Sequence, residues 1–361
     1  MLLGPSCLFS LKYKSKGINP CYTYRMEICY LLAFPDSDDG KSPPPEQFKG
    51  LKNAPYFQPI DIDLVTLGEE TIIIEGYAVA VTRQRYDGVV QMVECHFDLR
   101  DPFAPSVLQE RTKIQDALQS RYIPEEYRRN GLFEEYTILL VDDARPTPDK
   151  WLDKNALALA NFIRSQREVL DKEEIGRILA SRTRYSTDDL TLVDWEGAVI
   201  VAPEGDFQSD IVLLKIGNYQ LLRYRMLDKL IEEMLDKINE AFFQNRRRPR
   251  ATRGLIRQIA EHRLEVMLDF ERAEQNLLLI GDWYTAKLYE SIQNEFYLKD
   301  WKESVRSKLD NLENIVETIQ ENFALSFETL MDRLQMLGWV ILLIGYIYLY
   351  MLDAGWINFP R

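Results

Sequence analysis

Short apolar runs separated by polar turns dominate the chain from residue 26 to about residue 208. The segments 27–34 (EICYLLAF), 71–81 (TIIIEGYAVAV) and 89–99 (VVQMVECHFDL) are rich in Val, Ile and aromatic residues, which favour strands. The second and third segments flank the turn at Asp87-Gly88, and Asp-Gly between two such runs indicates a hairpin. We therefore expect these two strands to be antiparallel neighbours.

Two later runs extend the predicted sheet. Segment 136–143 (YTILLVDD) predicts one strand, and 190–203 (LTLVDWEGAVIVAP) predicts a strand pair bent at Glu196-Gly197. Helical spacing of apolar residues lies between the strands, and the proline-rich segment 36–50 predicts a loop. The predicted helices cover 107–121, 150–168 and 173–181.

From about residue 209, apolar residues recur at the three- and four-residue spacing of amphipathic helices. One stripe consists of Leu227, Ile231, Met234, Ile238 and Phe242. A second consists of Leu255, Ile259, Val266, Phe270, Ala273, Leu277 and Ile280. We expect two long antiparallel helices that bury both stripes.

A third stripe alternates steps of four and three, which is the heptad spacing of helices that pack along a seam. Its members are Val305, Leu309, Leu312, Val316, Ile319, Phe323, Ser326 and Leu330. Such a seam packs against another helix of the same bundle or against a second copy of the chain. This pattern is compatible with packing inside one chain and with a homo-oligomer.

Residues 334–352 (LQMLGWVILLIGYIYLYML) carry no charged side chain. At about 1.5 Å per residue this segment is long enough to cross the hydrocarbon core of a bilayer. Trp339 near one end and Tyr348 near the other match the aromatic positions found at membrane interfaces. We predict one transmembrane helix whose partner is the lipid bilayer; a buried core helix is the alternative.

These patterns predict an α+β fold: an N-terminal mixed sheet with helical cover, then a long-helix bundle or coiled coil that ends in one transmembrane helix. The expected parts are a disordered or misassigned start (1–25), an α/β cytoplasmic domain (26–208), a helical bundle (209–333), the transmembrane helix (334–352) and a short tail (353–361). More basic residues precede the span than follow it, which favours a single-pass protein whose N-terminal body faces the cytoplasm.

Composition narrows the function classes. The net charge of −13 argues against a general nucleic-acid binder, which needs a basic surface. The four cysteines lack the spacing of a disulfide framework, so we interpret them as thiols. No catalytic signature and no Gly-x-Gly-x-x-Gly fingerprint are present. We therefore expect a protein that is not an enzyme and needs no cofactor.

Acidic residues gather near the predicted boundary between the sheet and the helices. Asp188, Asp194, Asp206 and Asp210 are candidate ligands for a divalent cation, because oxygen clusters of this kind bind Mg²⁺ or Ca²⁺. A solvated acidic loop is the alternative, since the spacing matches no known ligand pattern.

Five arginines cluster around Pro249, at the predicted bend between two helices. They are candidates for contacts with anionic lipid headgroups, and an exposed basic loop is the alternative. The residues are Arg246, Arg247, Arg248, Arg250 and Arg253.

Only two histidines are present, His96 and His262, which leaves little material for a multi-histidine site. Cys95 and His96 are adjacent on a predicted strand, so their side chains point to opposite faces and cannot share a ligand. We interpret both histidines as structural.

The segments 185–201 (YSTDDLTLVDWEGAVIV), 277–292 (LLLIGDWYTAKLYESI) and 301–323 (WKESVRSKLDNLENIVETIQENF), followed by the span, resemble a family of uncharacterised bacterial single-span membrane proteins. This resemblance implies an α/β domain, a helical bundle and one C-terminal membrane helix. A more distant likeness is to CorA-type channels, although the chain lacks their Gly-Met-Asn signature and second span.

Together these observations favour a non-catalytic, membrane-anchored interaction or scaffolding protein. The alternative from another class is a subunit of a CorA-like ion-conducting assembly.

Overall fold

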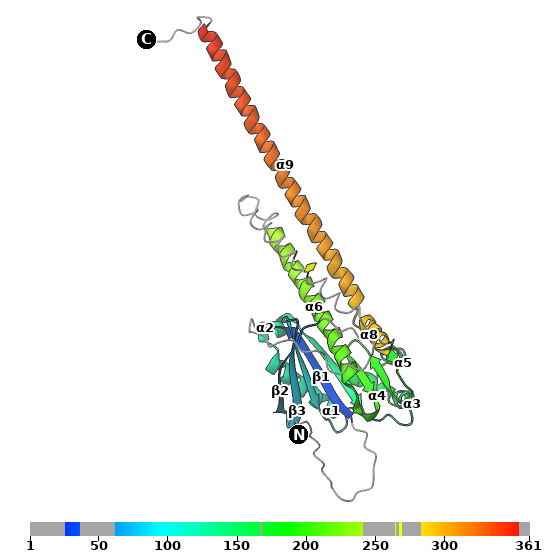
Figure 1. The fold of residues 1–361 in the computed structure, drawn as a ribbon. Coiled ribbons are helices and arrows are strands. Elements are labelled where there is room, and N and C mark those ends of the chain that lie inside the picture. The colour runs from blue at the N-terminus through cyan, green and yellow to red at the C-terminus, as the bar shows by residue number, and fades with distance from the viewer. Residues whose placement is uncertain are drawn as a thin grey trace, which may run out of the picture.

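An eight-stranded mixed sheet and a long C-terminal helix organise the protein (Figure 1). The computed structural model describes residues 26–36, 62–166, 168–240, 264, 267–268 and 283–353. The sheet lies at the N-terminal end of the chain and helices follow, with an apolar helix at the C-terminal end. The predicted α+β class is therefore confirmed.

The strands are ordered β2-β3-β4-β1-β5-β8-β7-β6 across the sheet. Neighbours are antiparallel except β5 and β8, which are parallel. Their bounds are β1 (Met26–Pro35), β2 (Leu64–Ile74), β3 (Tyr77–Tyr86), β4 (Val90–Phe97), β5 (Glu134–Val141), β6 (Arg182–Thr183), β7 (Leu190–Val193) and β8 (Gly197–Val201). The predicted strands at 27–34 and 136–143 correspond to β1 and β5, and the run at 190–203 contains the predicted strand pair.

Two tight turns set the register on one side of the sheet. The predicted hairpin at Asp87-Gly88 joins β3 to β4, and both turn residues have positive φ, 50° and 68°. The prediction of one strand over 71–81 was wrong, because Glu75 and Gly76 also adopt positive φ and separate β2 from β3. Glycine at the second turn position tolerates that conformation without steric cost.

Helices cover both faces of the sheet. Their bounds are α1 (Pro105–Tyr122), α2 (Glu125–Asn130), α3 (Pro148–Lys154), α4 (Ala156–Ile163), α5 (Lys172–Ile178), α6 (Gln208–Asn239), α8 (Trp283–Glu295) and α9 (Leu298–Asp353), with a short 3-10 turn, η1, at Pro203–Gly205. The predicted helix at 107–121 is α1. The prediction of a single helix over 150–168 was wrong, because that region contains α3 and α4, separated at Asn155.

Alternate side chains of β1 enter different cores. Ile28, Tyr30 and Leu32 pack with α1, α3, α4 and α5 on one face of the sheet. Cys29 and Leu31 pack on the other face, where α6 lies. Because both faces are buried, β1 is apolar at nearly every position instead of alternating between apolar and polar residues.

Helix α6 joins the sheet to the long C-terminal helix. Its first half is buried against the sheet, and Leu227, Ile231, Met234 and Ile238 in its second half form a continuous apolar core with α9. The first predicted stripe is confirmed over these four residues, whereas Phe242 and all seven residues of the second stripe lie outside the described residues. Residues 1–25 and the loop at 37–50 also lie outside them.

The predicted seam begins on α9 with Val305, Leu309, Leu312 and Val316, which are buried in the core that they share with α6. This packing is intramolecular, one of the two arrangements that the seam predicts. A homo-oligomer stays a prediction, as does the proposed division at residue 208. Helix α6 itself packs against both the sheet and α9.

The apolar end of α9 extends away from the rest of the described structure (Figure 1). Met331–Met351 is the helical stretch long and apolar enough to cross a membrane, and none of it is buried. A core helix would be covered by other elements, whereas this stretch is exposed. The alternative of a buried core helix therefore does not fit the described residues.

Candidate metal centre

Strand pairing brings Cys29, Glu94 and His96 together on the α6 face of the sheet. In the antiparallel pair of β1 and β4, Cys29 lies opposite His96 and Leu31 lies opposite Glu94. Residues two apart on a strand share a face, and directly opposite residues on paired strands also share one. The register therefore places the three side chains in one group, although 67 positions of sequence separate Cys29 from His96.

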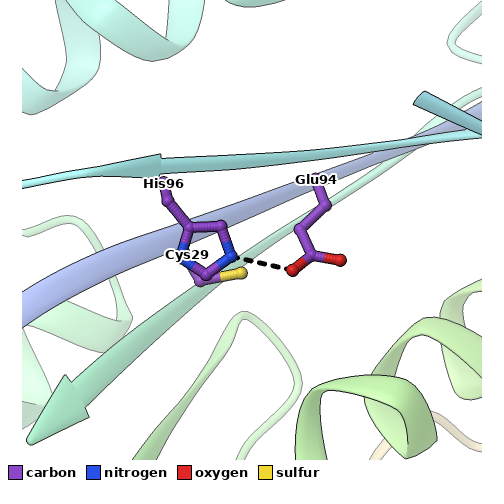
Figure 2. A group of neighbouring side chains, drawn as sticks. All are labelled: Cys29, Glu94 and His96. Atoms are coloured by element: carbon purple, nitrogen blue, oxygen red, sulfur yellow. Dashed lines mark hydrogen bonds and ion pairs between the residues drawn. The ribbon is translucent and has the colours of Figure 1, made fainter. Parts of the chain in front are cut away.

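The group is tightly connected. The sulfur of Cys29, a ring nitrogen of His96 and a carboxylate oxygen of Glu94 all lie within 4.8 Å of one another. Figure 2 shows the imidazole and the carboxylate on the same side of β4, with the Cys29 sulfur beside the ring. His96 Nε2 lies 2.8 Å from Glu94 Oε1, and His96 Nδ1 lies 2.9 Å from Glu27 Oε1. Both ring nitrogens therefore contact a carboxylate.

Lys215 reaches this group from α6. Its Nζ donates to Glu94 Oε2 at 2.7 Å and to Gln84 Oε1 at 2.8 Å, and the residue is only 2% exposed. A buried ammonium is costly unless it is paired. Glu94 thus lies between two cationic partners, one bonded to each of its oxygens.

Electrostatics fix the charges of the group. Burial disfavours the ionised Glu94, but the hydrogen bond from His96 and the charge of Lys215 outweigh it and lower the pKa of Glu94 to about 2. Burial also disfavours the imidazolium, yet the Cys29 sulfur and hydrogen bonds to Glu27 and Glu94 raise the pKa of His96 above its usual value. Burial raises the pKa of the Cys29 thiol, although His96 partly opposes it.

At neutral pH the group therefore holds paired carboxylates and cations beside a protonated thiol. Sulfur, imidazole nitrogen and carboxylate oxygen are the three donor types that zinc uses in proteins. Among the described residues, Cys29, Glu94 and His96 form the group of His, Cys, Asp or Glu side chains whose ligand atoms lie close enough together to hold one metal ion.

The four predicted aspartate ligands do not form such a group. Asp188 and Asp206 are exposed, whereas Asp194 and Asp210 are buried. Asp194 pairs with Arg164 at 3.3 Å, an ion pair that already supplies its counter-charge. The metal site predicted at these residues has no geometric support in the described part of the chain.

Asp210 instead belongs to a hydroxyl cluster. Its Oδ2 accepts hydrogen bonds from Thr191 Oγ1 on β7 and from the Tyr284 hydroxyl on α8, the latter at 2.8 Å. Burial raises the pKa of Asp210 to about 6, with the two hydroxyls opposing the rise and Asp189 and Asp206 adding to it. The carboxylate of Asp210 therefore connects α6 with β7 and α8.

A cavity of about 500 Å³ lies near the start of β5, between α1, α6 and the turn at Trp195. Glu134 and Glu196 in its lining pair with Arg225 and Arg164. Its lining includes none of Cys29, Glu94 or His96, so the cavity is separate from the candidate metal centre.

The other predicted site residues cannot be placed. Arg246, Arg247, Arg248, Arg250 and Arg253 lie outside the described residues, as does His262. The interpretation of Cys95 and His96 as pointing to opposite faces is confirmed, because Cys95 packs in the core on the helix-covered face away from α6. The interpretation missed that His96 meets Cys29 and Glu94 instead. Glu94-x-His96 on one strand was the available signal.

The fold and the site define a class: an α+β body with a buried Cys-His-Glu group and a projecting apolar helix. Residues 56–208 match a family model described as the N-terminal domain of uncharacterized protein MJ0711. This match ends where α6 begins and covers less than half of the chain.

A relative in the archaeon Methanocaldococcus jannaschii carries the same description, "Uncharacterized protein MJ0711". It is 24% identical to this chain over 206 residues, which are 57% of this chain and 63% of the relative. The chain thus spans less than two thirds of the relative's length. No solved structure matches. These comparisons do not support the expected resemblance to a bacterial family or to CorA-type channels, and neither the family nor the relative is described by an activity.

Proposed function

We propose that this protein is a membrane-anchored, non-catalytic interaction or scaffolding protein, whose α/β body is carried on a helical stalk. The observation that supports the proposal is the continuity of α9. One end of this helix is buried against α6, and the other is the exposed apolar stretch Met331–Met351. The same rigid element therefore connects the body to the segment that suits a bilayer.

The exposed stretch is the energetic argument for an anchor. Soluble monomers rarely leave an apolar surface of this extent in water. The 21 residues of Met331–Met351 extend about 31 Å as a helix, which matches a hydrocarbon core about 30 Å thick. All backbone groups within a helix are paired, as a membrane span requires.

The stalk sets a distance between the body and the membrane. About 22 Å of helix separates Val316, which is buried against α6, from Met331, where the apolar stretch begins. We propose that the body faces the cytoplasm, because Arg306, Lys308 and Arg333 precede the span. Partners, including a second copy of the chain, would meet the body or the stalk at that height.

Membrane extraction tests the anchor. We expect the full chain to stay with the membrane fraction through alkaline carbonate washes and to need detergent for release. Replacing Ile341 and Ile344 by arginine should release it, because each charge at the centre of a span costs about 2.5–3.5 kcal/mol. The matched control replaces Ile73 and Val169, which are exposed residues of the body, and should leave extraction unchanged. Release of the parent chain without detergent would refute the anchor.

Two further measurements test the rest of the proposal. Protease added to intact cells should spare the body, and should digest it once the membrane is permeabilised. The mass of the protein in detergent should exceed that of one chain if copies associate through the stalk. A strict monomer that retains no partner would count against the interaction role while leaving the anchor intact.

A further inference from the structure

We propose that Cys29, Glu94 and His96 bind a divalent transition-metal ion, with zinc the best fit to the donor set. The three ligand atoms already lie within 4.8 Å of one another, on two strands whose register is fixed by the surrounding sheet. A metal ion would therefore find its ligands assembled on rigid elements.

The donor types select the metal. Magnesium and calcium take oxygen ligands, whereas sulfur, imidazole and carboxylate together suit zinc and related ions. Three protein ligands leave a fourth tetrahedral position for water. The proposal is independent of the anchor, since it concerns only the sheet and α6.

Glu27 holds His96 in the orientation that metal binding needs. Its carboxylate lies 2.9 Å from Nδ1, while Nε2 faces Glu94. Histidine ligands commonly donate their other ring N–H to a carboxylate, which fixes the tautomer and the ring orientation. Glu27 is thus a positioning residue that leaves Nε2 for the metal.

The charges of the group also suit a dication. Without metal, Glu27 and Glu94 are balanced by His96 and Lys215. When a metal ion replaces one proton on Cys29 and one on His96, its two positive charges replace those of the two protons. The buried group therefore keeps its net charge, and Lys215 can remain on Glu94 Oε2.

The site has an entry route. Cys29 is fully buried, but the side chains of His96 and Glu27 are 25% and 29% exposed. A metal ion would arrive past His96 and meet the sulfur last. The burial of Cys29 keeps competing thiol reagents and bulk water from the ligand that defines the site.

Cobalt titration tests the proposal in the full chain, purified in detergent and stripped with a chelator. Cys7 and Cys21 are replaced by serine throughout, so that thiols outside the described residues do not contribute. We expect one Co²⁺ per chain and a thiolate-to-cobalt charge-transfer band in the near ultraviolet, which one equivalent of Zn²⁺ abolishes and excess Mg²⁺ does not. Absence of the band would overturn the proposal.

Matched variants locate the binding site. Cys29→Ser should lose the band, whereas Cys95→Ser should keep it, because Cys95 is equally buried but packs on the opposite face of the sheet. A band that survives Cys29→Ser, or that both variants lose, would overturn the assignment. Glu27→Gln keeps all three ligands and should weaken zinc binding by about 10- to 100-fold; unchanged affinity in that variant would contradict the arrangement.

Discussion

Two carboxylates are equally buried where α6 packs on the sheet, yet their environments shift their pKa values in opposite directions. Glu94 and Asp210 are each 7% exposed. Glu94 contacts two cations, Lys215 and His96, and its pKa falls to about 2. Asp210 contacts two hydroxyl groups, and its pKa rises to about 6. Burial penalises both charges, so the partners decide the outcome.

The comparison separates two ways of using a buried acid. The Glu94 group is a charge-balanced network in which each member depends on the others. The Asp210 cluster is a hydrogen-bonded junction whose charge is tolerated but not compensated. Removing one member of the Glu94 group should therefore destabilise the fold strongly. Removing the charge of Asp210 should instead stabilise the fold.

The largest effect is expected from Glu94→Gln in metal-free protein. The substitution leaves the buried Lys215 without its carboxylate, and breaking a buried ion pair in this way costs about 3–5 kcal/mol. Urea denaturation in the presence of a chelator measures the loss. Combining Glu94→Gln with Lys215→Met should recover part of it, because no unpaired ammonium remains. A double variant as unstable as the sum of the two single variants would contradict the pairing.

The pH dependence of the parent protein's stability should report the same pair, Glu94 and Lys215, with a somewhat smaller change in unfolding free energy. Because folding lowers the pKa of Glu94 from its ordinary value of 4.5 to about 2, its contribution is fully present above pH 4.5 and is lost as pH falls toward 2. The shift corresponds to about 3 kcal/mol. The difference in unfolding free energy between the parent and Glu94→Gln should therefore shrink over this range. A constant difference from pH 6 to pH 3 would show that Glu94 is not ionised in the fold.

Asp210→Asn should stabilise the protein, and its change in unfolding free energy should be smaller than the changes expected for Glu94. The folded pKa of Asp210 is raised from 3.8 to about 6, so the native state binds the proton more tightly than the unfolded chain. That contribution is present below pH 3.8 and is lost as pH rises through 6. The neutral amide avoids the loss, so the variant should gain about 2 kcal/mol on the parent between these values. Thermal unfolding at pH 4 and pH 7 measures it, and an equal difference at both would contradict the raised pKa.

The strands of the sheet could be predicted from the sequence more completely than the Glu94 group or the Asp210 cluster. Local signals fixed β1 and β5, because continuous apolar runs mark strands that are buried on both faces. The Asp87-Gly88 hairpin was also local. Glu75-Gly76 was missed because apolar residues continue on both sides of it, and nothing in the periodicity separates a long strand from two strands joined by a tight turn.

The site depended on information that no local pattern contains. Cys29 meets His96 only through the register of β1 on β4. The residues that flank Lys215 in the sequence are almost all apolar. Only the packing of α6 on the sheet shows that Lys215 reaches Glu94. Asp206 and Asp210 look alike in the sequence, but Asp210 is buried in the first turn of α6, whereas Asp206 precedes the helix and is exposed.

The smallest effect is expected from Tyr284→Phe. The substitution removes one of the two hydroxyls that donate to Asp210, and the loss of one such hydrogen bond costs about 1 kcal/mol. Because that hydroxyl favours the ionised carboxylate, its removal should raise the pKa of Asp210 further, so the cost should be greater at pH 7 than at pH 4. Tyr185→Phe is the matched control, since the Tyr185 ring packs against Tyr284 at 5.8 Å but is exposed. Both substitutions keep the aromatic ring, so if both variants lost stability equally, the hydrogen bond from Tyr284 to Asp210 would not account for the effect. The distinction between a charge-balanced group and a hydroxyl junction would then fail at the Asp210 cluster.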